Sequence, residues 1–192
     1  MTRIISGYAR GVRLVVPPSG TRPTSDRVRE AIFSSLDAWG VLPGAHIIDL
    51  YAGSGALGLE AISRGAMGAT LVEKGGKAAQ TARRNTHQVI AAYRGTPSPR
   101  VEVIPRSVAA FLESTSVTAE VIFIDPPYDL NEDALAHDLE RVAGLLTQNG
   151  VVLVERSSRS PEPQWPEGLE LFRRKDYGET TLWWADHGES TN

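Results

Sequence analysis

Two different spacings of hydrophobic residues divide this chain into candidate strands and helices. Between positions 46 and 155, short runs of apolar, mostly β-branched residues predict buried strands. They are separated by segments in which apolar residues recur every three or four positions, which is typical of amphipathic helices. Strands that alternate with helices indicate a parallel sheet covered by helices and joined by right-handed crossovers. The expected strands are HIIDLY, ATLVEK, VEVI, EVIFID and GVVLVE.

The two ends of the chain depart from this alternation. Arg3–Ser6 and Val12–Val16 flank a turn with glycine at both ends, which predicts a short β-hairpin. A linker rich in proline, glycine and serine follows, and Thr24, Ser25 or Asp26 can cap the helix after it. Near the other end, LELFRRKDYGETTLWWAD predicts a second hairpin that turns at its Tyr-Gly pair.

We therefore expect three parts in the chain. Residues 1–22 form a basic β-hairpin and linker, residues 23–186 form one α/β domain, and residues 187–192 form a flexible tail. A length of 192 residues, of which 41% are hydrophobic, is enough for one such core.

The composition excludes several kinds of chemistry. The chain has no cysteine, so it has neither disulfides nor a thiolate nucleophile, which fits a reducing compartment. Its four histidines are scattered, so we expect no metal site. The sequence has no run of about 18 apolar residues, so we expect no membrane span. The start of the chain lacks the apolar stretch of a secretory signal. We expect a cytoplasmic protein that is a monomer.

The net charge of −3 conceals an asymmetry. The first 30 residues hold six arginines against two acids, so a basic arm precedes an acidic body. Such an arm is an expected footprint of a polyanionic partner such as a nucleic acid. A solvated surface hairpin can carry the same charges, so charge alone leaves both interpretations open. The candidate RNA-binding residues are Arg3, Arg10, Arg13, Arg22, Arg27 and Arg29.

A glycine-rich loop, DLYAGSGALGLE, lies between a predicted strand and a predicted helix. Its glycines Gly53, Gly55 and Gly58 form the pattern G-x-G-x-x-G and let the backbone approach a ligand closely. Glu73, at the end of the next strand, can accept hydrogen bonds from ribose hydroxyls. The pattern suits NAD or any other cofactor that contains adenosine. It is also compatible with a tight turn that binds nothing.

Three features favour S-adenosylmethionine over NAD. Asp49, just before the loop, would repel a pyrophosphate but suits the ammonium group of an amino acid. No tyrosine is followed four residues later by lysine, the base that a short-chain hydride-transfer enzyme requires. The segment Asp125–Tyr128 has no role in nicotinamide chemistry.

That segment, in VIFIDPPYDL, ends a buried strand with an acid, two prolines and a tyrosine. The prolines stiffen the backbone at the carboxyl end of a strand, where ligands bind in open α/β sheets. The Asp125 carboxylate and the Pro126 carbonyl can accept hydrogen bonds from an exocyclic base amine and free its lone pair. Tyr128 can stack on the base, an interaction of about 1–3 kcal/mol. A rigid loop that only caps the sheet is the alternative.

Four segments together resemble the RsmD family, whose members methylate the exocyclic amine of a guanine in bacterial 16S ribosomal RNA. They are RIISGYARGVRL, RPTSDRVREAIFSSL, DLYAGSGALGLEAISRGA and IDPPYD. The resemblance runs from Arg3 to about Trp184. It implies a class I methyltransferase fold, a Rossmann-like seven-stranded sheet with helices on both faces and an antiparallel last hairpin, extended by the small N-terminal β-hairpin.

The resemblance also assigns site residues. It implies that S-adenosylmethionine is the cofactor and that small-subunit ribosomal RNA or an assembling 30S particle is the partner. Where many methyltransferases have an aspartate that binds adenine, this chain reads IPRSVAAF, so Ser107 or a backbone carbonyl can substitute. The implied catalytic residues are Asp125, Pro126, Pro127 and Tyr128. The implied cofactor-binding residues are Asp49, Ala52, Gly53, Ser54, Gly55, Glu73, Lys74 and Ser107.

Two other functions remain open from the sequence. A DNA adenine amino-methyltransferase would use the same Asp-Pro-Pro-Tyr motif, but this short chain has no obvious target-recognition domain beyond the hairpin. A non-catalytic nucleic-acid-binding module with a vestigial pocket would not need Asp125 or an intact glycine loop.

Overall fold

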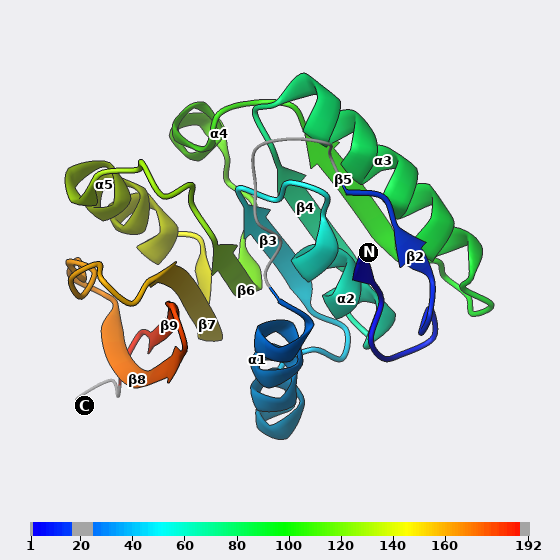
Figure 1. Ribbon diagram of the computed structural model, residues 1–192, viewed down its shortest axis with the longest axis horizontal. Helices are drawn as coiled ribbons and strands as arrows, with labels where there is room; N and C mark the ends of the chain where they lie inside the picture. The colour runs from blue at the N-terminus through cyan, green and yellow to red at the C-terminus, as the bar shows by residue number, and fades with distance from the viewer. Residues whose placement is uncertain (1, 17–24, 189–192) are drawn as a thin grey trace.

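The computed structural model describes residues 2–16 and 25–188, and their core is a seven-stranded sheet with the strand order β5-β4-β3-β6-β7-β9-β8 (Figure 1). The first five strands of this order run parallel, β9 pairs antiparallel with β7, and β8 pairs antiparallel with β9. The expected α/β fold is therefore confirmed. The strands are β3 (His46–Leu50), β4 (Gly68–Val72), β5 (Arg100–Ile104), β6 (Ala119–Ile124), β7 (Leu146–Ser157), β8 (Glu170–Tyr177) and β9 (Thr180–Asp186).

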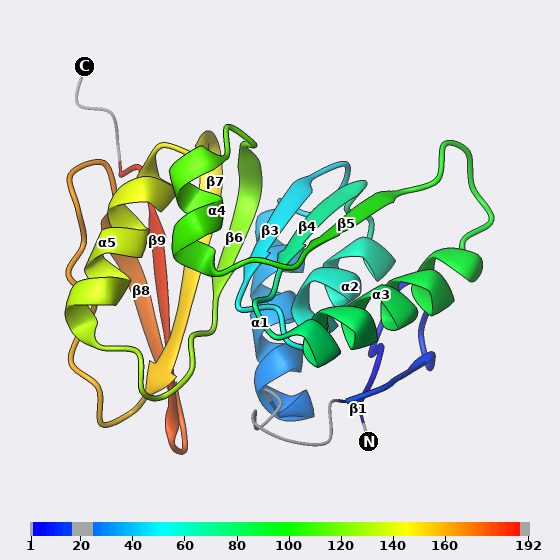
Figure 2. The same ribbon diagram turned by 90° about the horizontal axis from the view of Figure 1, so that it is seen from above.

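Helices cover both faces of the sheet (Figure 2). One face carries α1 (Asp26–Trp39), α2 (Ala56–Ser63) and α3 (Gly76–Ala91). The other face carries α4 (Val108–Ser114) and α5 (Glu132–Ala143). Because both faces are buried, the central strands are apolar at nearly every position instead of alternating.

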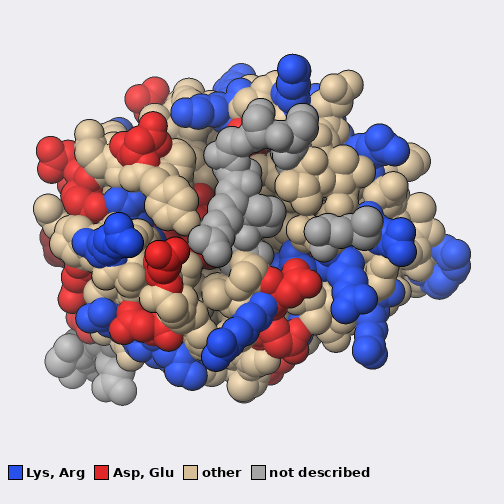
Figure 3. All heavy atoms as spheres, in the orientation of Figure 1, with Lys and Arg blue, Asp and Glu red and all other residues tan. Residues whose placement is uncertain are grey.

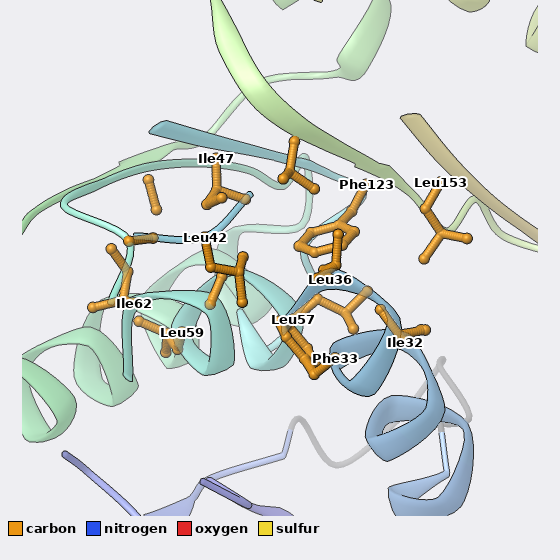
Figure 4. Packing of buried hydrophobic residues seen from close by; sticks show 14 of the residues in the cluster. Ile32, Phe33, Leu36, Leu42, Ile47, Leu57, Leu59, Ile62, Phe123 and Leu153 are labelled. Atoms are coloured by element: carbon orange, nitrogen blue, oxygen red, sulfur yellow. The ribbon is translucent and has the colours of Figure 1, made fainter. Parts of the chain in front are cut away.

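The two hydrophobic layers divide successive strand residues between them. Phe123 and Leu153 pack with α1 and α2 (Figure 4), whereas Ile122 and Val152 pack with α4 and α5. This alternation is the two-residue period of a strand. The parallel registers bring the carboxyl ends of β3, β4 and β6 together at one end of the sheet, where these strands lead into the segments that the sequence marked as functional.

Helix α1 shows how a local sequence signal sets an element boundary. The Ser25 side chain accepts a hydrogen bond from the Val28 amide, so Ser25 is the N-cap among the three expected candidates. The helix ends at Gly40, whose φ of +68° suits glycine.

The N-terminal hairpin is short and shares the core of the α/β domain. Strands β1 (Thr2–Arg3) and β2 (Arg13–Leu14) pair antiparallel, and the Ile4 and Leu14 side chains are buried in the layer of α1 and α2. The hairpin is also anchored by polar groups, since the Glu60 carboxylate accepts hydrogen bonds from the amides of Ile5 and Ser6. The hairpin is thus part of this core instead of an arm outside it.

The end of the described chain is also held in place. The sequence assigned His187 to a flexible tail, but its two ring nitrogens lie 2.8 and 3.0 Å from the carbonyl oxygens of Gly168 and Leu146. Residues 189–192 lie outside the described residues. No helix in residues 2–16 and 25–188 is both long and apolar enough to span a membrane.

Candidate active site

A cavity of about 730 Å³ opens at the carboxyl ends of β3, β4, β6 and β7. Its volume lies within the range of small-molecule and cofactor sites, about 300–1,000 Å³. The four predicted catalytic residues, Asp125–Tyr128, all line it. So do six of the eight predicted cofactor residues, namely Asp49, Ala52, Gly53, Ser54, Glu73 and Lys74. Gly55 and Ser107 are not among the lining residues.

The glycines of the loop after β3 serve different purposes. Gly53 and Gly55 have φ values of +56° and +80°, which side chains other than glycine rarely adopt. Gly58 lies inside α2, and a β-carbon there would lie 2.3 Å from Cδ2 of Leu71. The first two glycines therefore shape the loop, and the third lets α2 pack closely on β4.

Glu73 connects the two loops that border the cofactor side of the cavity. Its Oε2 accepts a hydrogen bond of 2.9 Å from the Gly53 amide, and its Oε1 accepts one of 2.6 Å from the Gly75 amide. A carboxylate oxygen can accept more than one hydrogen bond, so both oxygens keep acceptor capacity for a ligand hydroxyl. The geometry fits the ribose contact expected from the sequence and adds a structural role.

Asp49 is buried at the base of the same loop, with 1% of its surface exposed. Its Oδ2 accepts a hydrogen bond of 2.9 Å from the Gly58 amide. Burial raises the pKa of Asp49 to about 7, the Gly58 amide opposes the shift, and the charges of Asp125 and Glu73 add to it. A ligand cation at this carboxyl would favour its ionised form.

Ser107, for which an adenine contact is predicted, caps a helix in this structure. Its Oγ accepts a hydrogen bond from the Ala110 amide and caps α4, while the next residue, Val108, lines the cavity. An apolar wall of Leu57, Val72 and Val108 borders the cavity. Ser107 directly precedes a helical pattern in the sequence, and a serine in that position often indicates a helix cap.

The loop after β6 presents its polar and aromatic groups toward the cavity. Pro126 is buried, whereas Tyr128 is 76% exposed at the rim and available for stacking. The Leu130 amide donates to the Pro127 carbonyl, which closes the loop into a turn. These features fit the stiff, ligand-facing loop that the two prolines predict.

Arg156, at the end of β7, fixes the far side of this loop and was not singled out from the sequence. Its guanidinium donates to the Leu130 carbonyl and to the Glu132 carboxylate at the start of α5. Arg156 is almost completely buried and also lines the cavity. Its only sequence signal was a charge at the end of an apolar strand.

Tyr51 connects the glycine loop to α5, and the sequence gave no sign of this connection. It has a φ of +64°, and its hydroxyl donates a hydrogen bond of 2.5 Å to the buried Asp138 carboxylate. Burial raises the pKa of Tyr51, and the bond to Asp138 raises it further. Since α5 follows the Asp125–Tyr128 segment closely in the chain, this bond fixes the glycine loop relative to that segment.

The predicted RNA-binding arginines do not all lie on the surface. Arg3, Arg10, Arg13 and Arg27 are exposed. Arg29 is 1% exposed, donates to the Arg3 carbonyl and the Asp26 carboxylate, and lines the cavity. It therefore holds the hairpin against α1 at the border of the cavity, and its contact with RNA stays a prediction. Arg22 lies outside the described residues.

The sheet order, the glycine loop and the acidic residues at the ends of β3, β4 and β6 define a class I S-adenosylmethionine-dependent methyltransferase. The chain belongs to the family described as conserved hypothetical protein 95, whose model matches residues 2–186, and which is the RsmD family. It is 36% identical over 180 residues to ribosomal RNA small subunit methyltransferase D of Escherichia coli strain K12. The aligned region covers 92% of this chain and 85% of that relative.

Solved structures agree with this assignment. The yhhF protein from Escherichia coli is 34% identical, with a TM-score of 0.80 over 96% of this chain and 97% of that chain. A magnesium protoporphyrin IX methyltransferase from Synechocystis PCC 6803, solved with bound S-adenosylmethionine, has a TM-score of 0.65 at 12% identity and covers 87% of this chain and 86% of that chain. The second likeness shows the fold alone.

Proposed function

We propose that this methyltransferase modifies the N2 amine of a guanine in small-subunit ribosomal RNA. The observation that carries the proposal is that Asp125 and Tyr128 line the same cavity as Asp49 and Glu73. One cavity thus combines groups suited to a base amine with groups suited to S-adenosylmethionine. The curated relatives that are named for small-subunit ribosomal RNA supply the substrate class.

The donor set of the cavity fits S-adenosylmethionine. The Asp49 carboxyl suits the cofactor ammonium group, the Glu73 carboxylate suits the ribose hydroxyls, and the apolar wall with Val72 suits the adenine ring. When bound, the cofactor supplies an electrophilic methyl group on its sulfonium.

The chain's contribution to the reaction is to orient and polarise the amine. The Asp125 carboxylate and the Pro126 carbonyl accept hydrogen bonds from the amine, which makes the nitrogen lone pair available for attack. Both acceptors lie on a loop fixed by two prolines and by Arg156, so little reorganisation is required. Tyr128 stacks on the base and holds it in the pocket.

A base within folded RNA must leave its stack before its amine can enter this cavity, at a cost of a few kcal/mol. An assembling 30S particle that already presents the nucleotide would lower this cost. We therefore propose such a particle as the partner, a single copy of the chain as the active unit, and the cytoplasm as the compartment where they meet.

The proposal is tested by transfer of a labelled methyl group to three substrates: naked 16S ribosomal RNA, 30S particles from cells that lack this protein, and duplex DNA. Nucleoside analysis by mass spectrometry identifies the product. We expect N2-methylguanosine from RNA or particles. Methyladenine from DNA would support the alternative enzyme, and no transfer at all, together with no cofactor binding, would support a non-catalytic module.

A further inference from the structure

Helix α3 and the loop after it lack acidic residues. Between Lys74 and Arg100 the sequence contains six lysines and arginines and not a single aspartate or glutamate. This density of one charge sign is unusual in a chain whose net charge is −3.

The N-terminal hairpin lies beside this helix, as Figure 1 shows for β2 and α3. The Asn85 side chain of α3 forms hydrogen bonds with both backbone groups of Val15, and the rings of Tyr8 and Tyr93 contact edge to face with centroids 4.9 Å apart. Two of the exposed arginines of the hairpin, Arg10 and Arg13, are thereby joined to the basic helix in one surface.

The solvent-facing side of α3 carries Lys77 and Arg84. Ala82, Asn85 and Val89 are buried, and the helical period of 3.6 residues places Lys77 and Arg84 opposite them. Arg83, one position earlier, is turned toward β5, where its guanidinium lies 3.4 Å from the Val103 carbonyl. Neighbouring arginines on one helix therefore face different surroundings.

This basic surface reaches the active site. Lys74, two residues before α3, and Lys77, in its first turn, both line the cavity. We name the set Arg10, Arg13, Lys74, Lys77 and Arg84 the hairpin–α3 surface. Figure 3 shows lysines and arginines prevailing on the side of the hairpin and α3, and acids on the side of α5 and β8.

The cations of this surface, like several exposed arginines elsewhere on the described chain, lack the ion pairs that three buried arginine side chains form. Arg29, Arg64 and Arg156 form ion pairs with carboxylates of the protein. Within residues 2–16 and 25–188, no ion pair involves a member of the hairpin–α3 surface. Exposed cations without protein counter-charges are available to neutralise phosphates.

We infer that the hairpin–α3 surface binds the sugar-phosphate backbone of the RNA next to the methylated base and guides that strand to the cavity. The inference rests on the proposed function and extends the RNA contacts from the hairpin to α3. These contacts carry no base specificity; they set affinity and register, while the cavity selects the base.

The adjacent arginines of α3 provide a matched test. The single variant Arg84→Gln is compared with the control Arg83→Gln. The double variant Arg13→Gln/Arg84→Gln is compared with the control Arg83→Gln/Arg141→Gln, so each variant and its control lose the same charge. Arg141 is exposed on α5, away from the hairpin. The affinity for a 16S ribosomal RNA transcript is measured at several salt concentrations, with cofactor affinity as the check that each variant is folded.

Each phosphate contact contributes roughly 0.7–0.9 to the slope of log affinity against log salt. We expect Arg84→Gln to flatten the slope by that amount and Arg13→Gln/Arg84→Gln by about twice as much, while both controls keep the wild-type slope. A wild-type slope in Arg84→Gln, or an equal loss in Arg83→Gln, would overturn the inference. Methylation of the same transcript or of 30S particles by the wild type is measured alongside. If the wild type methylates either substrate, a contradicting salt slope overturns this inference and leaves the proposed function standing.

Discussion

The Asn85 side chain forms hydrogen bonds with both backbone groups of Val15, with Oδ1 accepting from the amide at 2.8 Å and Nδ2 donating to the carbonyl at 2.9 Å. The second hydrogen of the same Nδ2 goes to the Ser54 carbonyl in the glycine loop, also at 2.9 Å. One buried side chain thus links the N-terminal hairpin to the cofactor loop.

The first prediction concerns this link. Replacing Asn85 with alanine leaves partly buried backbone groups of Val15 and Ser54 without partners, and a group left so in a fully buried position costs about 1–3 kcal/mol. We expect Asn85→Ala to lower the melting temperature and to weaken S-adenosylmethionine binding, as measured by thermal unfolding with and without cofactor. Thr81→Ala, a truncation at an exposed hydroxyl of the same helix, is the control. A wild-type cofactor affinity in Asn85→Ala would show that the link does not shape the loop.

Deletion of the hairpin is predicted to damage the fold as well as RNA binding. Removing residues 1–16 would uncover the apolar surface against which Ile4, Ala9 and Leu14 pack and would leave the buried Glu60 without its amide donors. We expect melting temperature and cofactor affinity to fall together. Calorimetry and equilibrium dialysis measure the two quantities. A deletion variant with wild-type stability would mean that these contacts contribute little.

Much of the fold was predictable because its signals are local. The central strands are almost entirely apolar, and Ser25 caps its helix directly. Partners that are distant in the sequence had no such signal, so Asn85, Tyr51 and Arg156 were missed. The burial of Arg29 was not predicted, although it shares the α1 face of Phe33 and Leu36, four and seven residues later. Helical spacing, applied to charged as well as apolar residues, would have predicted its burial.

Asp125→Asn tests the polarisation of the amine. The amide retains the shape of the carboxylate but loses its charge, and it can present a donor toward the amine. We expect methyl transfer to fall by about 10² or more, the scale of one oriented electrostatic contact, while cofactor affinity stays close to wild type. Single-turnover transfer and calorimetry give the two values. Turnover within a few-fold of wild type would contradict this role.

Glu73→Ala should give the opposite pattern. Besides the ribose contact, it removes the acceptor for the Gly53 and Gly75 amides, so both loops beside the cofactor lose a support. We expect cofactor affinity to fall by about tenfold or more, since a lost charge-assisted contact costs about 1.5–3 kcal/mol. The kcat at saturating cofactor should change little. An unchanged Kd for S-adenosylmethionine would place the ribose contact elsewhere.

The last prediction concerns Asp49 and pH. In the protein without cofactor the pKa of Asp49 is about 7, well above its ordinary value of 3.8, so the folded state favours the protonated carboxyl. The resulting stabilisation is fully present below the ordinary pKa and is lost as the pH rises toward 7. Asp49→Asn, which stays neutral, should therefore weaken this part of the pH dependence of unfolding.

Cofactor binding should show the reverse trend, because an ammonium group next to Asp49 favours the ionised carboxylate. Binding below pH 7 must then release a proton, so we expect affinity for S-adenosylmethionine to rise between pH 5.5 and 7 and to level off above it, by up to about tenfold per pH unit. The residues that line the described cavity include no histidine that could produce the same profile. Calorimetry in two buffers of different ionisation enthalpy counts the released protons. A wild-type affinity independent of pH in this range, or an equal dependence in Asp49→Asn, would place the ammonium contact on another group.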